Sequence, residues 1–238
     1  MGLQHYRFIR RKARKAWGGN RFRYVVARRH VNGGLALALV ALLSCGLGTS
    51  AWSNEPARIL ALGDSLTAGY GLPAADSFPA RLEAALRSAG HPAEVINAGV
   101  SGDTAAGGLA RRDWALDGDP QYAIVALGAN DGLRALDTEE TYRNLDRILG
   151  KLKARGVHVL LAGMYAPPNL GREYGESFNS IYPRLAKKHA VKLYPFFLDG
   201  VVADPALNQM DGLHPNARGV DVMVERILPH VLRLIEDS

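Results

Sequence analysis

Short apolar runs alternate with longer amphipathic segments along most of this chain, and the alternation limits the folds that it can adopt. The runs have the length and composition of buried strands, and they cover residues 57–62, 93–98, 122–127, 157–162 and 191–194. The segments with a helical spacing of apolar residues cover 77–89, 105–116, 138–155, 175–190 and 216–236. Strands that alternate with helices through short connections form a parallel sheet with helices on both faces. The sequence therefore predicts one α/β domain with a central five-stranded parallel sheet.

Local signals indicate where two of the helices begin. Ser77 is a suitable N-cap for the helix at 77–89, because its hydroxyl can accept a hydrogen bond from the first turn, and Pro79 fits that turn. Thr104 is placed in the same way before the helix at 105–116. We expect both side chains to cap their helices.

The first 53 residues differ from the rest of the chain in charge. They contain ten Lys or Arg and no Asp or Glu, and an apolar run at 35–43 leads through small residues to Ser53. That order is typical of an export signal, and the run is shorter than the ~20 residues of a membrane span. We expect cleavage after Ser53, export to the periplasm or the medium, and a separate domain over residues 54–238.

Two other interpretations of the leader stay open. Residues 42–45 resemble a bacterial lipoprotein box, which would make Cys45 a lipidated N-terminus and would be the only route to membrane association. In the second interpretation, Arg28-Arg29 belongs to a twin-arginine export signal. Cys45 is the only cysteine, so residues 54–238 have neither a disulfide nor a thiolate metal site.

The charge of the remaining residues argues against a nucleic-acid partner. Residues 54–238 carry 19 Lys or Arg against 23 Asp or Glu, a net charge of −4, so the excess of +6 in the whole chain belongs to the leader. A nucleic-acid-binding surface needs clustered positive charge. Arg111 and Arg112 are interpreted as solvated charges on a helix.

Glycine and polar residues follow each of the first three strands. The three loops contain Gly63-Asp64-Ser65-Leu66, Ser101-Gly102-Asp103-Thr104 and Gly128-Ala129-Asn130-Asp131. Because the carboxyl ends of parallel strands lie at one edge of the sheet, we expect these loops to converge. A serine there is a candidate nucleophile, although serine is also common in plain turns. Asp64 is assigned to hydrogen bonding within its loop.

A base for such a serine, and an acid to orient the base, occur close together near the C-terminus. In Asp211-Gly212-Leu213-His214-Pro215 the carboxylate can bond the imidazole and fix its tautomer. A serine nucleophile also needs donors for an oxyanion. The amide of Asn130 and the backbone N–H groups of Gly102 and Ser65 are the candidates. Each residue taken alone also fits an ordinary turn.

These four blocks, in this order, resemble the signature of the SGNH (GDSL) hydrolases, from about residue 57 to the C-terminus. The resemblance is strongest to the bacterial periplasmic arylesterases, thioesterases and lysophospholipases. It implies Ser65 as nucleophile, His214 as base and Asp211 as its orienting acid, with Ser65, Gly102 and Asn130 as oxyanion donors. It also implies a three-layer, flavodoxin-like α/β/α fold with no metal or other cofactor. Ala129 departs from the family, which often has a second glycine there.

The resemblance leads us to expect an exported, monomeric serine esterase that hydrolyses carboxylic esters and thioesters through an acyl-enzyme. Its partners would be small acyl esters or thioesters, with lysophospholipid among them. Leu133, Arg134 and Tyr165 are candidates for the lining of an acyl pocket, and plain loop packing is the alternative for all three. Gly-x-Ser-x-Gly, the motif of ordinary α/β-hydrolases, is missing from the sequence.

Three alternatives remain at this point. An SGNH carbohydrate acetylesterase would use the same site. A metal-dependent phosphoesterase could use Asp64, Asn130, Asp211 and His214 as ligands, although such sites usually have more histidines. A binding protein of the same fold without catalysis is the third.

Overall fold

The structure is a computed structural model of the whole chain, and it describes residues 55–115 and 118–238. The expectations for the leader, including those for Cys45 and for cleavage after Ser53, concern residues outside this described part. Within residues 55–115 and 118–238, no helix combines the length and the apolarity that a membrane span requires.

Five parallel strands form one sheet in the order β2-β1-β3-β4-β5. The strands are β1 (Ala57–Gly63), β2 (Ala93–Gly99), β3 (Tyr122–Ala126), β4 (His158–Ala162) and β5 (Lys192–Tyr194). Each end lies within one residue of the prediction from the apolar runs. β1 lies inside the sheet between β2 and β3, and its apolar residues Ile59 to Leu62 are buried because both faces of the sheet are covered.

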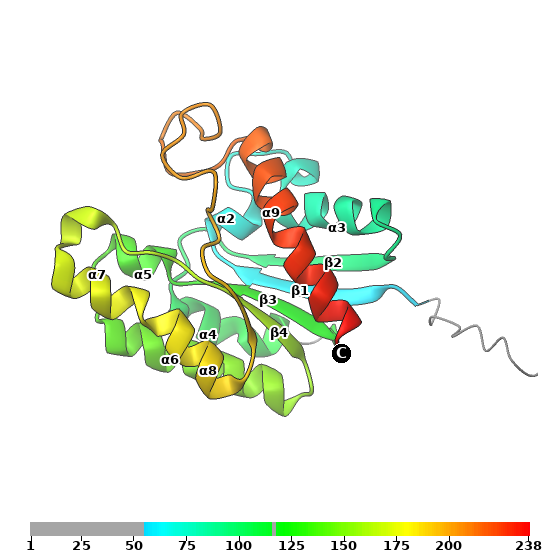
Figure 1. Cartoon of the computed structure of the whole chain (residues 1–238), viewed down its shortest axis with the longest axis horizontal. Coiled ribbons are helices and arrows are strands. Elements are labelled where there is room, and N and C mark those ends of the chain that lie inside the picture. The colour runs from blue at the N-terminus through cyan, green and yellow to red at the C-terminus, as the bar shows by residue number, and fades with distance from the viewer. Residues whose placement is uncertain (1–54, 116–117) are drawn as a thin grey trace, which may run out of the picture. The chain divides into compact units, whose positions relative to one another are not determined.

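Helices cover both faces of the sheet and complete the predicted three-layer fold (Figure 1). On one face α3 (Phe78–Ser88) packs against α9 (Ala217–Glu236), and the other face carries α4 (Ala105–Ala115), α6 (Thr138–Ala154) and α8 (Ile181–His189). The chain moves from β1 to β2 in one direction and from β3 to β4 in the other. Because crossover connections are right-handed, this reversal places α3 on the face opposite to α4, α6 and α8.

The helix predicted at 175–190 is two helices in the structure. They are α7 (Arg172–Asn179) and α8, and Ser180 separates them. Pro183 accounts for the break, because it has no N–H to donate to the carbonyl of Asn179 and is tolerated only in a first helical turn. Pro183 lies in the first turn of α8.

Several short helices were not predicted. They are α2 (Ser65–Ala68), α5 (Ala129–Leu133) and two 3₁₀ turns, η1 (Ala74–Asp76) and η2 (Pro168–Leu170). Helices of three to five residues are too short to show a period of 3.6 residues. The two that follow β1 and β3, α2 and α5, contain Ser65 and Asn130.

One of the two predicted caps is wrong and the other is confirmed. Ser77 occupies the N-cap position of α3, but its hydroxyl donates to the carbonyl of Ala74 at 2.7 Å and makes no capping bond. The competing turn η1 therefore takes the hydroxyl. Thr104 does cap α4, since its Oγ1 accepts a hydrogen bond from Gly107 N at 3.2 Å.

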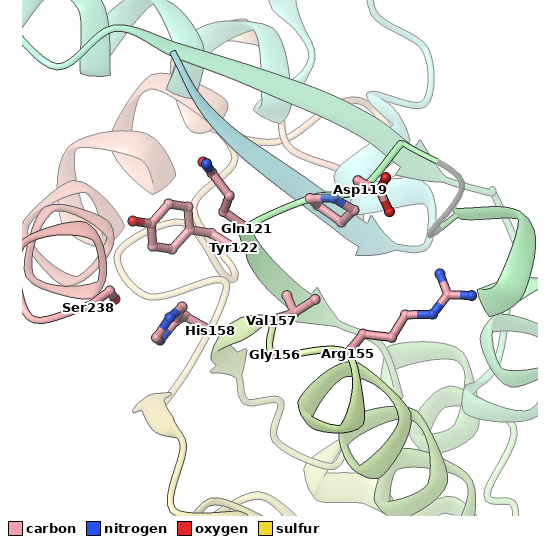
Figure 2. A pocket seen from close by; sticks show the side chains of 9 residues that line it. Asp119, Gln121, Tyr122, Arg155, Gly156, Val157, His158 and Ser238 are labelled. Atoms are coloured by element: carbon pink, nitrogen blue, oxygen red, sulfur yellow. The ribbon is translucent and has the colours of Figure 1, made fainter. Parts of the chain in front are cut away.

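A cavity of about 370 Å³ opens at the amino ends of β3 and β4, the edge of the sheet opposite to Ser65. Figure 2 shows its lining, which includes Gln121, Tyr122 and His158 as well as Ser238 at the C-terminus. The rings of Tyr122 and His158 lie side by side there, with centroids 5.8 Å apart. None of the predicted site residues belongs to this cavity.

Candidate active site

The carboxyl ends of β1, β2 and β3 lie at the same level, as predicted. In the sheet register Gly63 pairs with Gly99 on one side and with Ala126 on the other. β1 and β3 are also the neighbours whose connections leave in opposite directions, and such a point in an open α/β sheet forms a crevice. A Cβ at Gly63 would lie 2.0 Å from Thr67 Oγ1. The loop after β1 therefore needs glycine to turn directly into α2.

Asp64 and Ser65 begin α2 at this crevice. Asp64 is the N-cap, and its Oδ1 accepts a hydrogen bond from Leu66 N at 3.0 Å. Its side chain is buried, with the residue 1% exposed, and burial raises the pKa of its carboxyl from 3.8 to about 6. Ser65 follows as the first helical residue. The capping bond therefore fixes the backbone that carries the serine.

Ser65, His214 and Asp211 form a chain of hydrogen bonds across 149 residues of sequence. Ser65 Oγ lies 3.0 Å from His214 Nε2, and His214 Nδ1 lies 2.6 Å from Asp211 Oδ2. With the proton of the neutral imidazole on Nδ1, the ring donates to Asp211 and accepts from the serine hydroxyl. In this arrangement the imidazole can remove the hydroxyl proton.

Backbone donors hold the carboxylate of Asp211 in this chain. Its Oδ1 accepts from His214 N at 3.0 Å and from Leu213 N at 2.9 Å. The His214 N–H first, and the imidazole after it, lower the pKa of Asp211 to about 2. Asp211 therefore stays ionised at any pH near neutrality and can stabilise a positively charged imidazole.

Gly102 and Asn130 lie at the same edge, on the loops after β2 and β3. Gly102 has φ +87°, which favours glycine, and no described residue accepts its N–H. Asn130 Nδ2 donates to the carbonyl of Asp103 at 2.9 Å and lies 3.5 Å from Asp64 Oδ2. The bond to Asp103 links the loop after β3 to the loop after β2. The structure thus brings together the side chains and N–H groups that the sequence singled out.

Arg111 is a part of this edge that the sequence analysis misjudged. It was interpreted as solvated, yet its side chain is only 17% exposed. The guanidinium donates to Gly63 O and Ala98 O, each at 2.8 Å, and to Asp103 Oδ2 at 2.5 Å. It therefore ties the ends of β1 and β2 to the loop of Gly102. Its position on α4, from which it reaches the ends of β1 and β2, is set by the fold, and an Arg-Arg pair in the sequence gives no sign of it.

The three residues proposed for an acyl pocket lie around the same edge. Leu133 is 53% exposed, and Tyr165 is 51% exposed with its ring 4.7 Å from that of Phe196. Arg134 donates through Nη2 to the carbonyl of Gly102 at 3.0 Å. Its guanidinium thus supports the Gly102 loop, and a contact with substrate stays a prediction for all three residues. Nowhere in the described part of the chain do three or more His, Cys, Asp or Glu gather as a metal site would require.

Residues 61–222 match the model of the GDSL-like lipase/acylhydrolase family. The chain belongs to this family. It is 38% identical over 185 residues to an arylesterase of Vibrio mimicus, an alignment that covers 77% of this chain and 92% of the relative. It is 43% identical over 159 residues to thioesterase 1/protease 1/lysophospholipase L1 of Escherichia coli K12, which covers 66% of this chain and 75% of the relative.

Solved structures of GDSL-like hydrolases confirm the fold. The crystal structure of AlinE4, an esterase of the SGNH-hydrolase family, is 52% identical, with a TM-score of 0.65 over 75% of this chain and 96% of that one. The crystal structure of TesA has a TM-score of 0.71 at 37% identity and covers 74% and 99% of the two chains. The family resemblance, the three-layer fold and the class of hydrolases that act on ester bonds are confirmed, whereas the roles of the individual residues stay predictions.

Proposed function

We propose that this GDSL-like hydrolase is an exported serine esterase that cleaves carboxylic esters and thioesters through an acyl-enzyme on Ser65. The observation that carries the proposal is the chain of hydrogen bonds from Asp211 through His214 to Ser65. A nucleophile, a base and an orienting acid in this geometry are what acyl transfer to serine requires.

In the proposed first half-reaction, Ser65 Oγ attacks the carbonyl carbon of the ester while His214 Nε2 takes the hydroxyl proton. The carbonyl oxygen becomes an oxyanion, for which the N–H groups of Ser65 and Gly102 and the amide of Asn130 are the candidate donors. When the tetrahedral intermediate collapses, the bond to the alcohol or thiol breaks and His214 gives its proton to that leaving group.

In the second half-reaction, water attacks the acyl-enzyme with His214 again as the base. Collapse of the second intermediate breaks the bond to Ser65 Oγ, returns a proton to the serine and releases the carboxylic acid. Asp211, held ionised by its backbone donors, stabilises the imidazolium in both halves. Loss of one oxyanion donor is expected to lower kcat by ~10²–10³.

The distribution of exposed apolar side chains supports a substrate with an acyl chain. Within the described residues, the exposed large apolar side chains lie in the connections that follow the carboxyl ends of the strands, with Leu133 at the end of α5, or on the segment that leads to His214. They are Tyr70, Val100, Leu133, Leu136, Tyr165, Val202, Met210 and Leu213. Exposed apolar groups collected around one site indicate a binding surface for apolar groups. Lysophospholipids and aryl esters both fit this description.

The test is a panel of substrates with matched variants. Wild type is expected to hydrolyse p-nitrophenyl esters, with Ser65→Ala and His214→Ala each losing at least ~10³-fold in kcat. A chain-length series, lysophospholipid, an acyl-CoA and an acetylated sugar identify the acyl group and separate this proposal from an acetylesterase. Turnover that survives Ser65→Ala, or that chelation of metal ions abolishes, would refute the serine mechanism and favour a metal-dependent one.

Export and the state of the N-terminus are part of the proposal and rest on the composition of residues 1–53. Mass spectrometry of the protein recovered from the cell envelope is expected to show a mature chain that begins at Asn54. A lipidated Cys45 would instead establish a membrane anchor. An uncleaved chain in the cytosol would contradict export.

A further inference from the structure

Gln209 links the two parts of the chain that carry Ser65 and His214. It lies half-buried in the loop between β5 and α9, and its side-chain amide donates two hydrogen bonds. Nε2 reaches Tyr70 O at 2.7 Å and Pro215 O at 2.9 Å. Tyr70 follows α2, which begins at Ser65, and Pro215 directly follows His214. One amide group thus joins segments that are distant in sequence.

Further contacts close a ring around the Ser65–His214 pair. Tyr70 N donates to Ser65 O at 3.1 Å, and the Tyr70 ring lies 4.5 Å from the imidazole of His214. Gln209 N donates to His214 O at 2.7 Å. In the described chain, the Gln209–Tyr70 bond and the Ser65–His214 bond are the only hydrogen bonds between residues 64–72 and 198–216.

The chemistry of this contact requires a primary amide. Two carbonyl oxygens must be met by two N–H groups on one nitrogen, which Gln provides and Glu or Met of similar length does not. Gly71, with φ +74°, lets the backbone approach, because a Cβ there would lie 2.3 Å from Gln209 Oε1. The turn at Gly71 and the amide of Gln209 therefore fit each other.

We propose that Gln209 is a positioning residue that sets the distance between Ser65 and His214 in ester hydrolysis. The inference rests on the proposed function and adds to it a residue that contacts neither the substrate nor the reacting atoms. The segment that carries His214 needs such a support, because Asp211, Gly212 and Leu213 are exposed and gain little from core packing. A displacement of about 1 Å between reacting groups lowers rates by ~10²-fold.

The first test compares Gln209→Met with the matched control Gln121→Met in hydrolysis of p-nitrophenyl butyrate. Met keeps the length of the side chain and removes both donors. We expect kcat of the Gln209 variant to fall ~10–100-fold with KM within about threefold, because the pair is misplaced and substrate binding is untouched. The Gln121 variant also loses a hydrogen bond, which Gln121 Oε1 accepts from Arg58 N at 3.2 Å. Because this bond lies at the opposite edge of the sheet, Gln121→Met should keep the wild-type kcat.

The second test uses Gln209→Glu, whose carboxylate faces the same two carbonyl oxygens. Repulsion should lower its kcat below that of Gln209→Met at pH 8. At lower pH a protonated Glu can donate one hydrogen bond, so the ratio of kcat for the Glu variant to kcat for the Met variant should rise. Loss of stability alone would not produce this dependence at a temperature where circular dichroism shows both variants folded.

Each outcome decides one point. A folded Gln209→Met enzyme with kcat within twofold of wild type would overturn the inference and leave the esterase proposal standing. Should that variant fail to fold, Gln209→Ala takes its place, because it removes both donors without placing an apolar chain against the two carbonyl groups, and unchanged kcat there would overturn the inference equally. Absence of turnover and of Ser65 labelling in the wild type would instead contradict the proposed function.

Discussion

Asp64 and Asp211 are two carboxylates close to Ser65 whose surroundings move their pKa values in opposite directions. Asp211 is partly exposed and accepts hydrogen bonds from two backbone N–H groups and the imidazole, which lower its pKa to about 2. Asp64 is buried with one backbone donor, and burial raises its pKa to about 6. The ionised carboxylate suits the role proposed for Asp211, support of a positive imidazole, whereas Asp64 caps the turn before the serine.

Asp211→Asn is predicted to keep the loop and lose most of the activity. The side-chain oxygen of Asn can still accept the backbone N–H groups of Leu213 and His214. The NH2 group of Asn, however, would donate a hydrogen bond to His214 Nδ1. That bond favours the tautomer with its proton on Nε2, which cannot accept the proton of the Ser65 hydroxyl. We expect kcat for p-nitrophenyl butyrate to fall ~10³–10⁴-fold with little change in the melting temperature. Activity within tenfold of wild type would argue against Asp211 as the orienting acid.

Asp64 is predicted to make the stability of the fold depend on pH. Its pKa in the folded state is above the usual 3.8, so the folded state binds the proton more tightly and loses stability as the pH rises through about 6. A rise from 3.8 to about 6 corresponds to about 3 kcal/mol at ~1.4 kcal/mol per pH unit. The difference in the free energy of unfolding between Asp64→Asn and wild type should therefore shift in favour of the variant by up to about 3 kcal/mol from pH 4 to pH 8.

Urea unfolding of both proteins at the two pH values measures this difference. Because only the change between the two pH values is used, any constant effect of the new amide cancels. Asp199→Asn, which loses an exposed ion pair with Arg226, is the control and should show a smaller change. Equal differences in stability at pH 4 and pH 8 would mean that Asp64 does not titrate as its burial requires.

At the scale of the elements, the ends of the central strands are held by a side chain from a helix. Arg111 on α4 reaches across to the carbonyl groups of Gly63 at the end of β1 and Ala98 in β2. These carbonyls precede the loops of Ser65 and Gly102. The distance between Ser65 and Gly102 therefore depends on contacts of Arg111, which neither of these two residues makes itself.

Arg111→Met is predicted to lower both stability and kcat. The apolar part of the side chain is kept, but Ala98 O and Asp103 lose a charged donor and Gly63 O keeps only the N–H of Val100, at a cost of about 1–3 kcal/mol for each hydrogen bond lost to a charged group. The loops of Ser65 and Gly102 are then free to separate, so we expect kcat to fall ~10-fold. Arg143→Met, which removes an exposed ion pair with Glu140 on α6, is the matched control and should change neither. Equal behaviour of the two variants in urea unfolding and in the esterase assay would contradict this role.

The same elements show what the sequence could predict and what it could not. The strands and the long helices were predicted closely because hydrophobic periodicity is a local signal. A rule of topology predicted that Ser65, Gly102 and Asn130 meet at one edge, whereas Asp211 and His214 were added by their spacing and by the family resemblance. Arg111 and Gln209 were missed because their partners are backbone carbonyls up to 139 residues away, and no local pattern marks such a contact. The break before α8 could have been predicted from Pro183.

At the scale of the whole molecule, the two edges of the sheet differ in character. The carboxyl edge carries the hydrogen-bonded chain to Ser65 and the exposed apolar side chains of the described residues. The cavity at the amino edge contains Tyr122 and His158 and lies apart from both (Figure 2). Parallel strands produce this asymmetry, because all five deliver their following loops to one edge. An acyl ester bound beside Ser65 would meet apolar groups on several loops at once.

The central claim is that Ser65, activated by His214, is the nucleophile, and covalent labelling with a fluorophosphonate tests it most directly. Intact-mass spectrometry of the purified protein, followed by peptide mapping, counts the adducts and locates them. We predict one adduct per chain on Ser65, none in Ser65→Ala, and much slower labelling in His214→Ala. An adduct of unchanged yield in Ser65→Ala, or a wild-type labelling rate in His214→Ala, would contradict it.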